Sequence, residues 1–348
     1  IFLLLLCSAC FGNSEEFDTW AVIVCTSRYW FNYRHMANAL AIYKRVKQNG
    51  VPDNRIILMS SLEAQNDPRN PYPGKIFSTN NIEKMNLNIT NNNEFRDSHL
   101  FSTLSSTKAK ADDDDVQIDY GGNDCNTENF LRLLSNRHEI GTPLNQQLLS
   151  GPNSKILIYL TGHGGDSFLK FHDQQELSSS DLSTVFNDMY IKKRYKEILL
   201  IIDTCQASTL FNGIKSISIP NISYISSSNL NENSYAYDTN HMLGLAVIDR
   251  FTYKLTEYLS KIKIKNNNNS NKNKVTAANS KDSSTVNDLM KYLRKHETRA
   301  FMYSTATFMQ TKGSTPPNLM KISDFFGNSG NSGNNNDNNN NGGEYMNM

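Results

Sequence analysis

The sequence has no charge excess of either sign, because 35 Lys and Arg residues stand against 34 Asp and Glu residues, for a formal net charge of +1. A chain without a strong overall field does not attract nucleic acid or an anionic membrane surface, so we expect no nucleic-acid partner. The sequence also lacks any apolar run of the roughly 18 to 20 residues that a transmembrane helix requires. We therefore expect a protein that is soluble by itself.

The start of the chain has the profile of a secretory leader. The apolar run Ile1–Leu6 is followed by small residues up to Gly12 and then by acidic side chains, which is typical of the apolar region and cleavage zone of a signal peptide. We interpret residues 1–12 as a signal-peptide remnant, with a buried first strand as the alternative. The first interpretation predicts a lumenal protein.

Cysteine is scarce as well. Of five cysteines, three follow the predicted leader, namely Cys25, Cys125 and Cys205. An odd number of cysteines in an oxidising compartment leaves at least one thiol unpaired or bonded to another chain. Such a thiol invites a functional explanation.

Polar low-complexity segments interrupt the sequence that can fold. Segments rich in Asn, Lys, Ser and Gly cannot bury enough apolar surface to form a core. The remainder fits one large domain. The predicted organisation is a signal-peptide remnant at 1–12, a main folded domain at 13–262 with an insert at about 80–112, a second insert at 263–285, a helical extension at 286–326, and a disordered tail at 327–348.

Unbroken apolar runs of strand length recur along the chain, and runs of this kind are typical of strands buried on both faces. They predict strands at Trp20–Cys25, Arg55–Met59, Lys155–Leu160, Glu197–Ile202 and Ile222–Ile225. Helical spacing predicts a helix capped by Asn126 or Thr127 and further helices at Arg34–Gln48, Asp181–Lys192, Met242–Ile262 and Val286–Arg294. The alternation predicts a three-layer α/β/α domain with a mainly parallel central sheet.

A histidine and a cysteine directly follow two of these predicted strands. His163 lies among glycines in Thr161–Gly165, and Cys205 lies in the segment Asp203–Gln206. Because the carboxyl ends of parallel strands meet at one sheet edge, we expect the two side chains to be neighbours. A thiol beside an imidazole suits nucleophilic catalysis, and a helix start after Cys205 would stabilise the thiolate and an oxyanion.

Simpler interpretations exist for each residue alone. A glycine-flanked histidine is often structural, and a cysteine at a strand end is often a small buried apolar residue. A phosphate-binding glycine loop is disfavoured, because neither a Walker lysine nor a G-x-G-x-x-G spacing is present. Together the residues favour a Cys/His acyl-transfer site.

Several strings resemble a known family. YLTGHGGDSFLKF and LLIIDTCQAS resemble the caspase-fold cysteine peptidases of the legumain-related branch. TWAVIVCTSRYWFNYRHMANALAIYKRVKQNGVPDNRIILM, DPRNPYPGKIF, TENFLRLL and GLAVIDRFT resemble, within that branch, the catalytic subunits of GPI-anchor transamidases. The resemblance implies a caspase-like fold and a cysteine-dependent enzyme.

The resemblance also implies roles for individual residues. It implies that Cys205 is the nucleophile and His163 the general acid and base, with the N–H groups of Gly164 and Cys205 in an oxyanion hole. It implies that Asn32 orients His163. The implied substrate-binding residues are Arg34, His35, Asp203, Ser227 and Ser228.

A calcium site is implied by the same resemblance. Its ligands would be Asp53, the carbonyl of Ile56, Gln117 and Asp119, and oxygen ligands are what a hard cation requires. Gln117 replaces an acidic residue of the family. The implied chemistry needs no cofactor, so this calcium would be structural.

The implied function is that of the catalytic subunit of a GPI transamidase. Such an enzyme cleaves the C-terminal GPI signal of a proprotein through a cysteine thioester and transfers the new carboxyl group to the phosphoethanolamine amine of a GPI lipid. The alternatives are a legumain-like asparaginyl endopeptidase, in which water resolves the thioester, and a non-catalytic scaffold of the same fold.

The implied partners are the other subunits of a membrane-bound transamidase complex, proproteins with C-terminal GPI signals, and GPI lipid. We expect the chain in the endoplasmic reticulum lumen, associated with the membrane through its partner subunits. Many family members bond to a partner through a cysteine where this chain has Asn66 and Asp67, which makes Cys125 the candidate substitute.

Overall fold

The computed structural model describes residues 18–61, 63–78, 87–89, 115–262 and 284–327. The predicted signal-peptide remnant and most of the predicted inserts and tail lie outside these residues.

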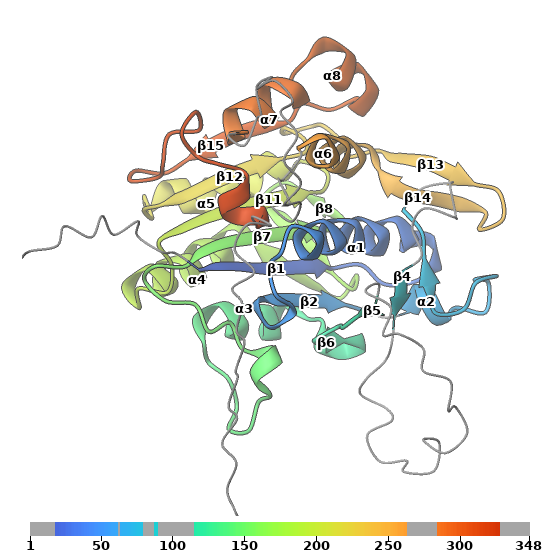
Figure 1. Ribbon diagram of the computed structural model, residues 1–348, viewed down its shortest axis with the longest axis horizontal. Helices are drawn as coiled ribbons and strands as arrows, with labels where there is room; N and C mark the ends of the chain where they lie inside the picture. The colour runs from blue at the N-terminus through green and yellow to red at the C-terminus, as the bar shows by residue number, and fades with distance from the viewer. Residues whose placement is uncertain (1–17, 62, 79–86, 90–114, 263–283, 328–348) are drawn as a thin grey trace, which may run out of the picture.

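A seven-stranded sheet forms the centre of the fold, with the strand order β15-β12-β11-β7-β1-β2-β6 (Figure 1). All neighbouring strands pair in parallel except β12 and β15, which pair antiparallel. The strands are β1 (Thr19–Cys25), β2 (Ile56–Ser60), β6 (Tyr120–Gly121), β7 (Lys155–Thr161), β11 (Glu197–Asp203), β12 (Ile222–Ser226) and β15 (Thr307–Gln310).

Helices cover both faces of this sheet. One face packs against α1 (Tyr33–Gln48), α6 (Arg250–Lys261), α7 (Val286–Leu293) and α9 (Ser323–Phe326). The opposite face packs against α3 (Thr127–Ser135), α4 (Ser179–Ile191) and α5 (Phe211–Ser216). Two short helices, α2 (Glu63–Asn66) and α8 (His296–Met302), lie at the margin of the first face, where Ala64 and Met302 join its core. The prediction of a three-layer α/β domain with a mainly parallel sheet is confirmed.

The apolar runs explain why the strands lie inside. In β1, Ala21 and Ile23 point to the α1 face, whereas Val22 and Val24 point to the α3 and α4 face. Successive side chains of a strand point to opposite faces, so a strand covered on both sides must be apolar at every position. Each large aliphatic side chain buried in this way stabilises the fold by about 1.5 to 3 kcal/mol.

Smaller β elements surround the central sheet. A three-stranded sheet of β8 (Gly164–Gly165), β9 (Phe168–Phe171) and β10 (Gln175–Ser178) follows β7 directly. The hairpin of β13 (Ala236–Asn240) and β14 (Leu245–Asp249) precedes α6. A further small sheet joins β3 (Lys75–Ile76), β4 (Leu87–Ile89) and β5 (Asp115–Val116).

Two parts of the chain differ from the expected elements. The helix predicted over Met242–Ile262 begins only at Arg250, because Leu245–Asp249 pair with β13 across a turn in which Gly244 has φ of 71°. The segment 286–326 contains β15 as well as helices, and Phe325 and Phe326 are fully buried. That segment is therefore part of the main core.

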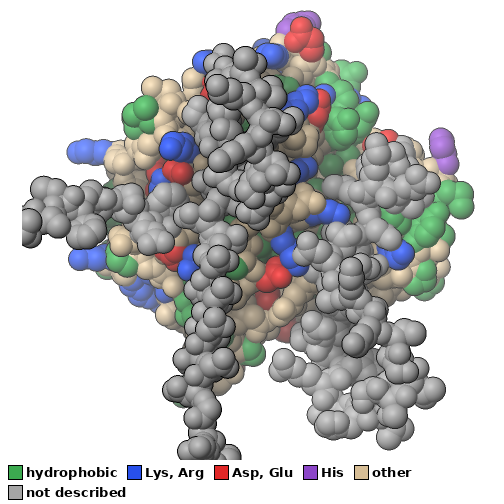
Figure 2. Space-filling view, viewed as in Figure 1, with side chains coloured by type: hydrophobic (Ala, Val, Ile, Leu, Met, Phe, Trp, Pro, Cys, Tyr) green, Lys and Arg blue, Asp and Glu red, His purple; other side chains and the backbone are tan. Residues whose placement is uncertain are grey.

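The surface agrees with the charge balance of the sequence. Outside the grey atoms, Figure 2 shows basic and acidic side chains interspersed over the visible face, with no large area of one sign. Apolar side chains gather at the end formed by the β13–β14 hairpin, where Met242 is exposed. No helix within the described ranges has the length and apolar composition of a membrane span.

Candidate active site

His163 and Cys205 lie beyond neighbouring strands in the same register. β7 pairs with β11 so that Thr161 lies opposite Asp203. Each of the two residues follows that pair by two positions, at the carboxyl edge of the sheet, and both are half-buried. The structure therefore brings the thiol and the imidazole to adjacent strand ends, as the sequence predicts.

Asn32 fixes the orientation of the imidazole. Its Nδ2 donates to the carbonyl of Arg28 at 2.9 Å, which leaves Oδ1 as the acceptor, 2.7 Å from Nε2 of His163. His163 Nε2 must therefore carry the proton in the neutral ring, and Nδ1 carries the lone pair. This is the tautomer that a general base at Nδ1 requires.

The electrostatic surroundings favour the neutral imidazole. Burial lowers the pKa of His163, and the nearby charge of Arg34 lowers it further. Burial likewise holds the pKa of His35 well below its usual value, and the ring of His35 meets that of His163 edge to face with centroids 4.8 Å apart. A neutral His163 can accept a proton from a thiol near pH 7.

Gly164 offers one backbone N–H to a developing oxyanion. The bond from Lys170 N to the carbonyl of His163 makes those two residues a hydrogen-bonded pair of the antiparallel β8–β9 ladder. Gly164 and Leu169 are then a non-hydrogen-bonded pair, so the Gly164 N–H points away from β9. A Cβ at this glycine would lie 2.6 Å from Oγ1 of Thr204, the residue before Cys205, so the two loops touch.

The N–H of Cys205 is the second candidate donor. The flanking N–H groups of Thr204 and Gln206 donate to Ser227 Oγ and to the carbonyl of Glu232. In the described part of the chain, Cys205 N–H has no such acceptor. The helix expected after Cys205 begins as a 3-10 turn, Ala207–Leu210, reached through Gln206 at φ of 53°, and continues directly into α5.

Ser227 and Ser228 support this loop from behind. Both side chains are fully buried. Ser227 Oγ donates to the carbonyl of Thr204 at 3.1 Å, and Ser228 Oγ donates to the same carbonyl at 2.7 Å and accepts from Ala207 N at 3.1 Å. In this structure their side chains hold the nucleophile loop, and the expectation that these residues bind substrate stays a prediction.

Arg34 and His35 converge on Asp249, a residue that the sequence analysis missed. Arg34 Nε donates to Asp249 Oδ1 at 3.0 Å, Asn38 Nδ2 donates to Oδ2 at 2.6 Å, and His35 Nε2 lies 3.6 Å from Oδ2. Burial raises the pKa of Asp249 to about 7, and the charge of Asp203 adds to the shift. The sequence does hint at a functional residue here, because Asp249 directly follows a short apolar run, but only the fold places its carboxylate beside Arg34.

Asp203 lies beneath the nucleophile loop. Its side chain is almost completely buried and accepts hydrogen bonds of 2.6 Å from Ser234 Oγ and from Thr252 Oγ1. Burial raises the pKa of this carboxyl group. Asp203 and Asp249 are thus two buried acids under one site, and the charge of Asp203 disfavours ionisation of Asp249.

A second residue that the sequence analysis missed, Glu63, holds the loop that carries Asn32. Glu63 accepts from the Arg28 guanidinium, with Nε at 2.9 Å, and from Tyr29 N at 2.8 Å. The carbonyl of Arg28 in turn accepts from Asn32. A continuous set of hydrogen bonds therefore connects α2 to His163, and no local pattern in the sequence indicates it.

The predicted calcium ligands gather around Tyr43. Its hydroxyl donates to Asp53 Oδ1 at 3.0 Å, and the same Asp53 lies at 3.0 Å from Lys47 Nζ. Asp119 accepts from Leu58 N and Asn145 Nδ2, each at 2.9 Å, and burial raises its pKa to about 7, with a further rise from the charge of Asp53.

Ile56 begins β2 beside this group, and the Gln117 side chain is exposed. No group of three or more His, Cys, Asp or Glu side chains suited to a metal occurs in the described ranges. The predicted ligands are all oxygen atoms, which is the donor type that a hard cation such as calcium prefers. A cation between Asp53 and Asp119 would also reduce the repulsion between their two negative charges.

Cys25 and Cys125 lie inside the fold. Cys25, Cys125 and Cys205 are free thiols. Cys25 packs on the α1 face of the sheet and Cys125 on the opposite face, where its Sγ lies 3.3 Å from the carbonyl of Cys25. Cys125, the candidate substitute for the family's linking cysteine, is fully buried in this structure, so its thiol is not on the surface.

Comparison with known proteins agrees with this site. The profile of the peptidase C13 family matches residues 19–304. The chain belongs to the peptidase C13 family. It is therefore a member of a cysteine peptidase family, as the sequence analysis expects, and the catalytic roles of Cys205 and His163 stay predictions.

Its relatives include several transamidases. The GPI-anchor transamidase of Saccharomyces cerevisiae is 43% identical over 70% of this chain and 53% of its own length. The human GPI-anchor transamidase is 36% identical over 91% of this chain and 68% of its own length, and that of Schizosaccharomyces pombe is 37% identical over 91% and 71%. The predicted resemblance to GPI-anchor transamidases is confirmed.

The chain spans about half of the length of the budding-yeast relative, 53%, and about two thirds of the human one, 68%. Among solved structures, caspase-1 from Spodoptera frugiperda aligns with 91% of this chain and 92% of its own, at 11% identity and a TM-score of 0.45.

Proposed function

We propose that this chain is the catalytic subunit of a GPI transamidase, with Cys205 as the nucleophile and His163 as the general acid and base. The observation that carries the proposal is the shared register of the two residues at neighbouring strand ends. The hydrogen bond from His163 to Asn32 supports the assignment of roles. The names of the relatives support transamidation over hydrolysis.

The first step forms a thioester. His163 Nδ1 accepts the thiol proton while Cys205 Sγ attacks the carbonyl carbon of the ω residue. The N–H groups of Gly164 and Cys205 stabilise the negative oxygen of the tetrahedral intermediate. When the C–N bond breaks, His163 returns the proton to the leaving nitrogen, and the tail peptide departs with a new amino group.

The second step transfers the acyl group. The amine of the phosphoethanolamine attacks the thioester carbon, and His163 accepts the proton that the amine loses. The intermediate then collapses with the Cys205 thiolate as the leaving group, and the proton returns to it. Attack by water would yield a free carboxylate instead, so transamidation requires that water be kept from the thioester.

The setting of this reaction follows from its substrates. Because the acceptor is a lipid and the leaving tail is apolar, the chain acts at a membrane surface in the endoplasmic reticulum lumen, attached through partner subunits. Proproteins with C-terminal GPI signals are its protein substrates.

A structural calcium ion accompanies this proposal. Asp53, the Ile56 carbonyl, Gln117 and Asp119 would hold it, and the ion would offset the repulsion that raises the pKa of Asp119. Thermal unfolding with calcium and with a chelator tests this. We expect a higher midpoint with calcium in the parent chain and no calcium effect in Asp119→Asn. Equal midpoints in the parent chain would exclude the ion.

Complementation tests the function. The chain, preceded by a complete leader, is expressed in cells depleted of their own transamidase catalytic subunit, and GPI-anchored protein at the surface is measured. We expect the parent chain and the control Cys125→Ala to restore anchoring, and Cys205→Ala to assemble without restoring it. A parent chain that assembles but yields only free, cleaved proprotein would support the endopeptidase alternative.

A further inference from the structure

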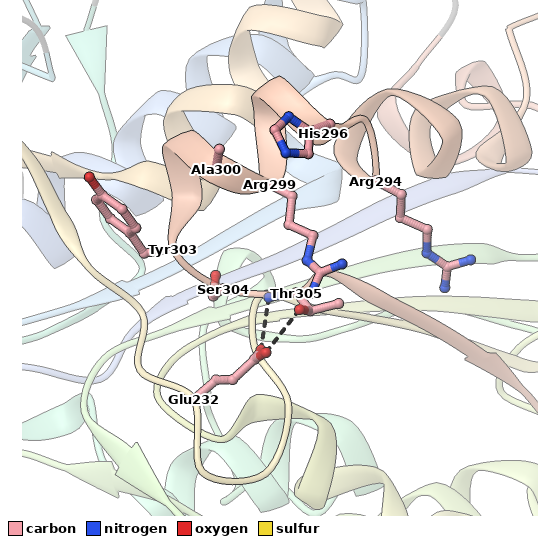
Figure 3. A pocket seen from close by; sticks show the side chains of 8 residues that line it. All are labelled: Glu232, Arg294, His296, Arg299, Ala300, Tyr303, Ser304 and Thr305. Carbon is pink, nitrogen blue, oxygen red and sulfur yellow. Dashed lines mark hydrogen bonds between the residues drawn. The ribbon is translucent and has the colours of Figure 1, made fainter.

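A cavity of about 510 Å³ lies beside the active site, between the loop after β12 and the segment that leads into β15 (Figure 3). Its lining includes Glu232 from that loop and Arg294, Arg299, Tyr303 and Thr305 from the region of α8. The mechanism described above uses none of these side chains. The question is what kind of group this cavity receives.

The cavity lies level with the nucleophile. Ile202, Ser226 and Thr307 form one row across β11, β12 and β15. Cys205 follows that row by three positions, just after the end of β11, and Ser304 precedes it by three positions, just before the start of the antiparallel β15, so both lie past the same sheet edge. Two strand spacings separate them, which is about 10 Å.

The loops of the two sites are joined. Gln206 N, next to the nucleophile, donates to the carbonyl of Glu232 at 2.9 Å. Ser304 Oγ donates to the carbonyl of Ser227 at 2.8 Å. The surface between Cys205 and the cavity is therefore formed by loops that are hydrogen-bonded to each other, and a peptide bound at Cys205 can extend along it to the rim of the cavity.

The sheet order decides which part of a substrate passes over the cavity. β7, with His163, lies on one side of β11, whereas β12 and β15 lie on the other. Since His163 must protonate the leaving nitrogen, the leaving peptide lies on the β7 side and the acyl part extends toward β15. An extended chain advances about 3.3 Å per residue, so about 10 Å corresponds to the third residue upstream of the cleaved bond.

The charge of the cavity favours an anion. The carboxylate of Glu232 is already engaged by Thr305 N, Thr305 Oγ1 and Asn229 N, each at 2.8 Å. Figure 3 shows the Arg299 guanidinium directed toward Thr305 and Glu232. The hydrogen bonds to Glu232 and the charge of Arg299 hold the pKa of Glu232 below its usual value against the effect of burial, so Arg299 already faces this carboxylate. Arg294 donates to the carbonyl of Ala306 at 3.3 Å. Two guanidinium groups therefore stand against one carboxylate, which leaves the lining with a net positive charge.

We propose that Arg299, with Arg294, forms a subsite for an acidic side chain about three residues upstream of the cleaved bond. This specificity rests on the proposed acyl transfer at Cys205. A guanidinium binds a carboxylate through charge-assisted hydrogen bonds, whereas a lysine at the same peptide position is repelled. Because the acyl part stays attached through both steps, the subsite also retains it while the tail peptide leaves.

Peptide binding to the full-length Cys205→Ala chain tests the subsite without requiring any chemistry. Fluorescent peptides carry Glu, Gln or Lys at the third position upstream of the ω residue and are otherwise identical. We expect the Glu peptide to bind about five- to tenfold more tightly than the Lys peptide. Arg299→Gln should reduce this ratio to near one, and Arg299→Glu should invert it.

Lys295→Gln is the matched control, because Lys295 is exposed next to the cavity but does not line it. It makes the same charge change and should leave the ratio intact. Equal binding of all three peptides, or a ratio that falls equally in Lys295→Gln, would overturn the subsite. Loss of anchoring in the complementation assay would instead concern the proposed function, because the binding ratio does not depend on a reactive thiol.

Discussion

Replacing Asn32 with alanine removes the acceptor that fixes the imidazole of His163. The lost contacts are the 2.7 Å bond to His163 Nε2 and the 2.9 Å bond to the Arg28 carbonyl. A polar group left without a partner in a buried site costs about 1 to 3 kcal/mol. If the unpaired imidazole N–H raises the free energy of the transition state by this amount, turnover drops by about 5- to 150-fold, since each 1.36 kcal/mol corresponds to about tenfold.

The rate at which an electrophilic peptide labels Cys205 measures this effect directly. We expect Asn32→Ala to lower the maximal labelling rate, with little change in the peptide concentration that gives half of it, because Asn32 positions His163 and is itself almost fully buried.

Asn32→Asp supplies the matched comparison, because it keeps the shape and adds a charge. A carboxylate beside the imidazole stabilises the protonated ring, so the pKa of His163 should rise. The base form is the neutral ring, and the acidic limb of the pH profile should therefore move to higher pH. An Asn32→Ala chain that labels as fast as the parent at every pH, or an acidic limb that moves to lower pH in Asn32→Asp, would refute this account of His163.

Three further changes test the surrounding structure. Glu63→Gln weakens the hydrogen bonds that hold the Asn32 loop and should lower the labelling rate by about three- to tenfold, while the midpoint of thermal unfolding stays unchanged. An unchanged labelling rate would show that Glu63 does not support Asn32. Ser228→Ala removes one of the two side-chain donors to the Thr204 carbonyl and leaves the buried Ala207 N–H without its side-chain acceptor, so urea unfolding should show a loss of about 2 kcal/mol; a loss near zero would contradict the buried support. Asp119 binds a proton up to about pH 7 in the folded, calcium-free chain but only to about pH 4 when unfolded, so its contribution to stability falls as pH rises between those values. Asp119→Asn should flatten that part of the stability profile measured in chelator, and an unchanged slope would show that Asp119 does not titrate as described.

Much of the fold could be predicted because its central strands are buried on both faces. Continuous apolar runs such as Lys155–Leu160 and Glu197–Ile202 have few other stable locations, and each became a strand of the main sheet. The hairpin of β13 and β14 and the edge strand β15 are short and partly exposed, so pairing with a distant segment decides their structure. For this reason the local pattern predicts one helix over Met242–Ile262, although the first part of this segment is a strand.

The site divides in a similar way. Parallel strands end at a common edge, so the positions of His163 and Cys205 immediately after two apolar runs were sufficient to predict that they meet. The sequence by itself thus determined the parallel core, the Cys/His pair and the family, because these depend on local patterns and on the edge that parallel strands share. Only the tertiary structure decided that Ser228 lies behind the loop, that Asp249 faces Arg34, and that Arg299 lines a cavity level with the nucleophile, because those contacts join segments that no local pattern relates.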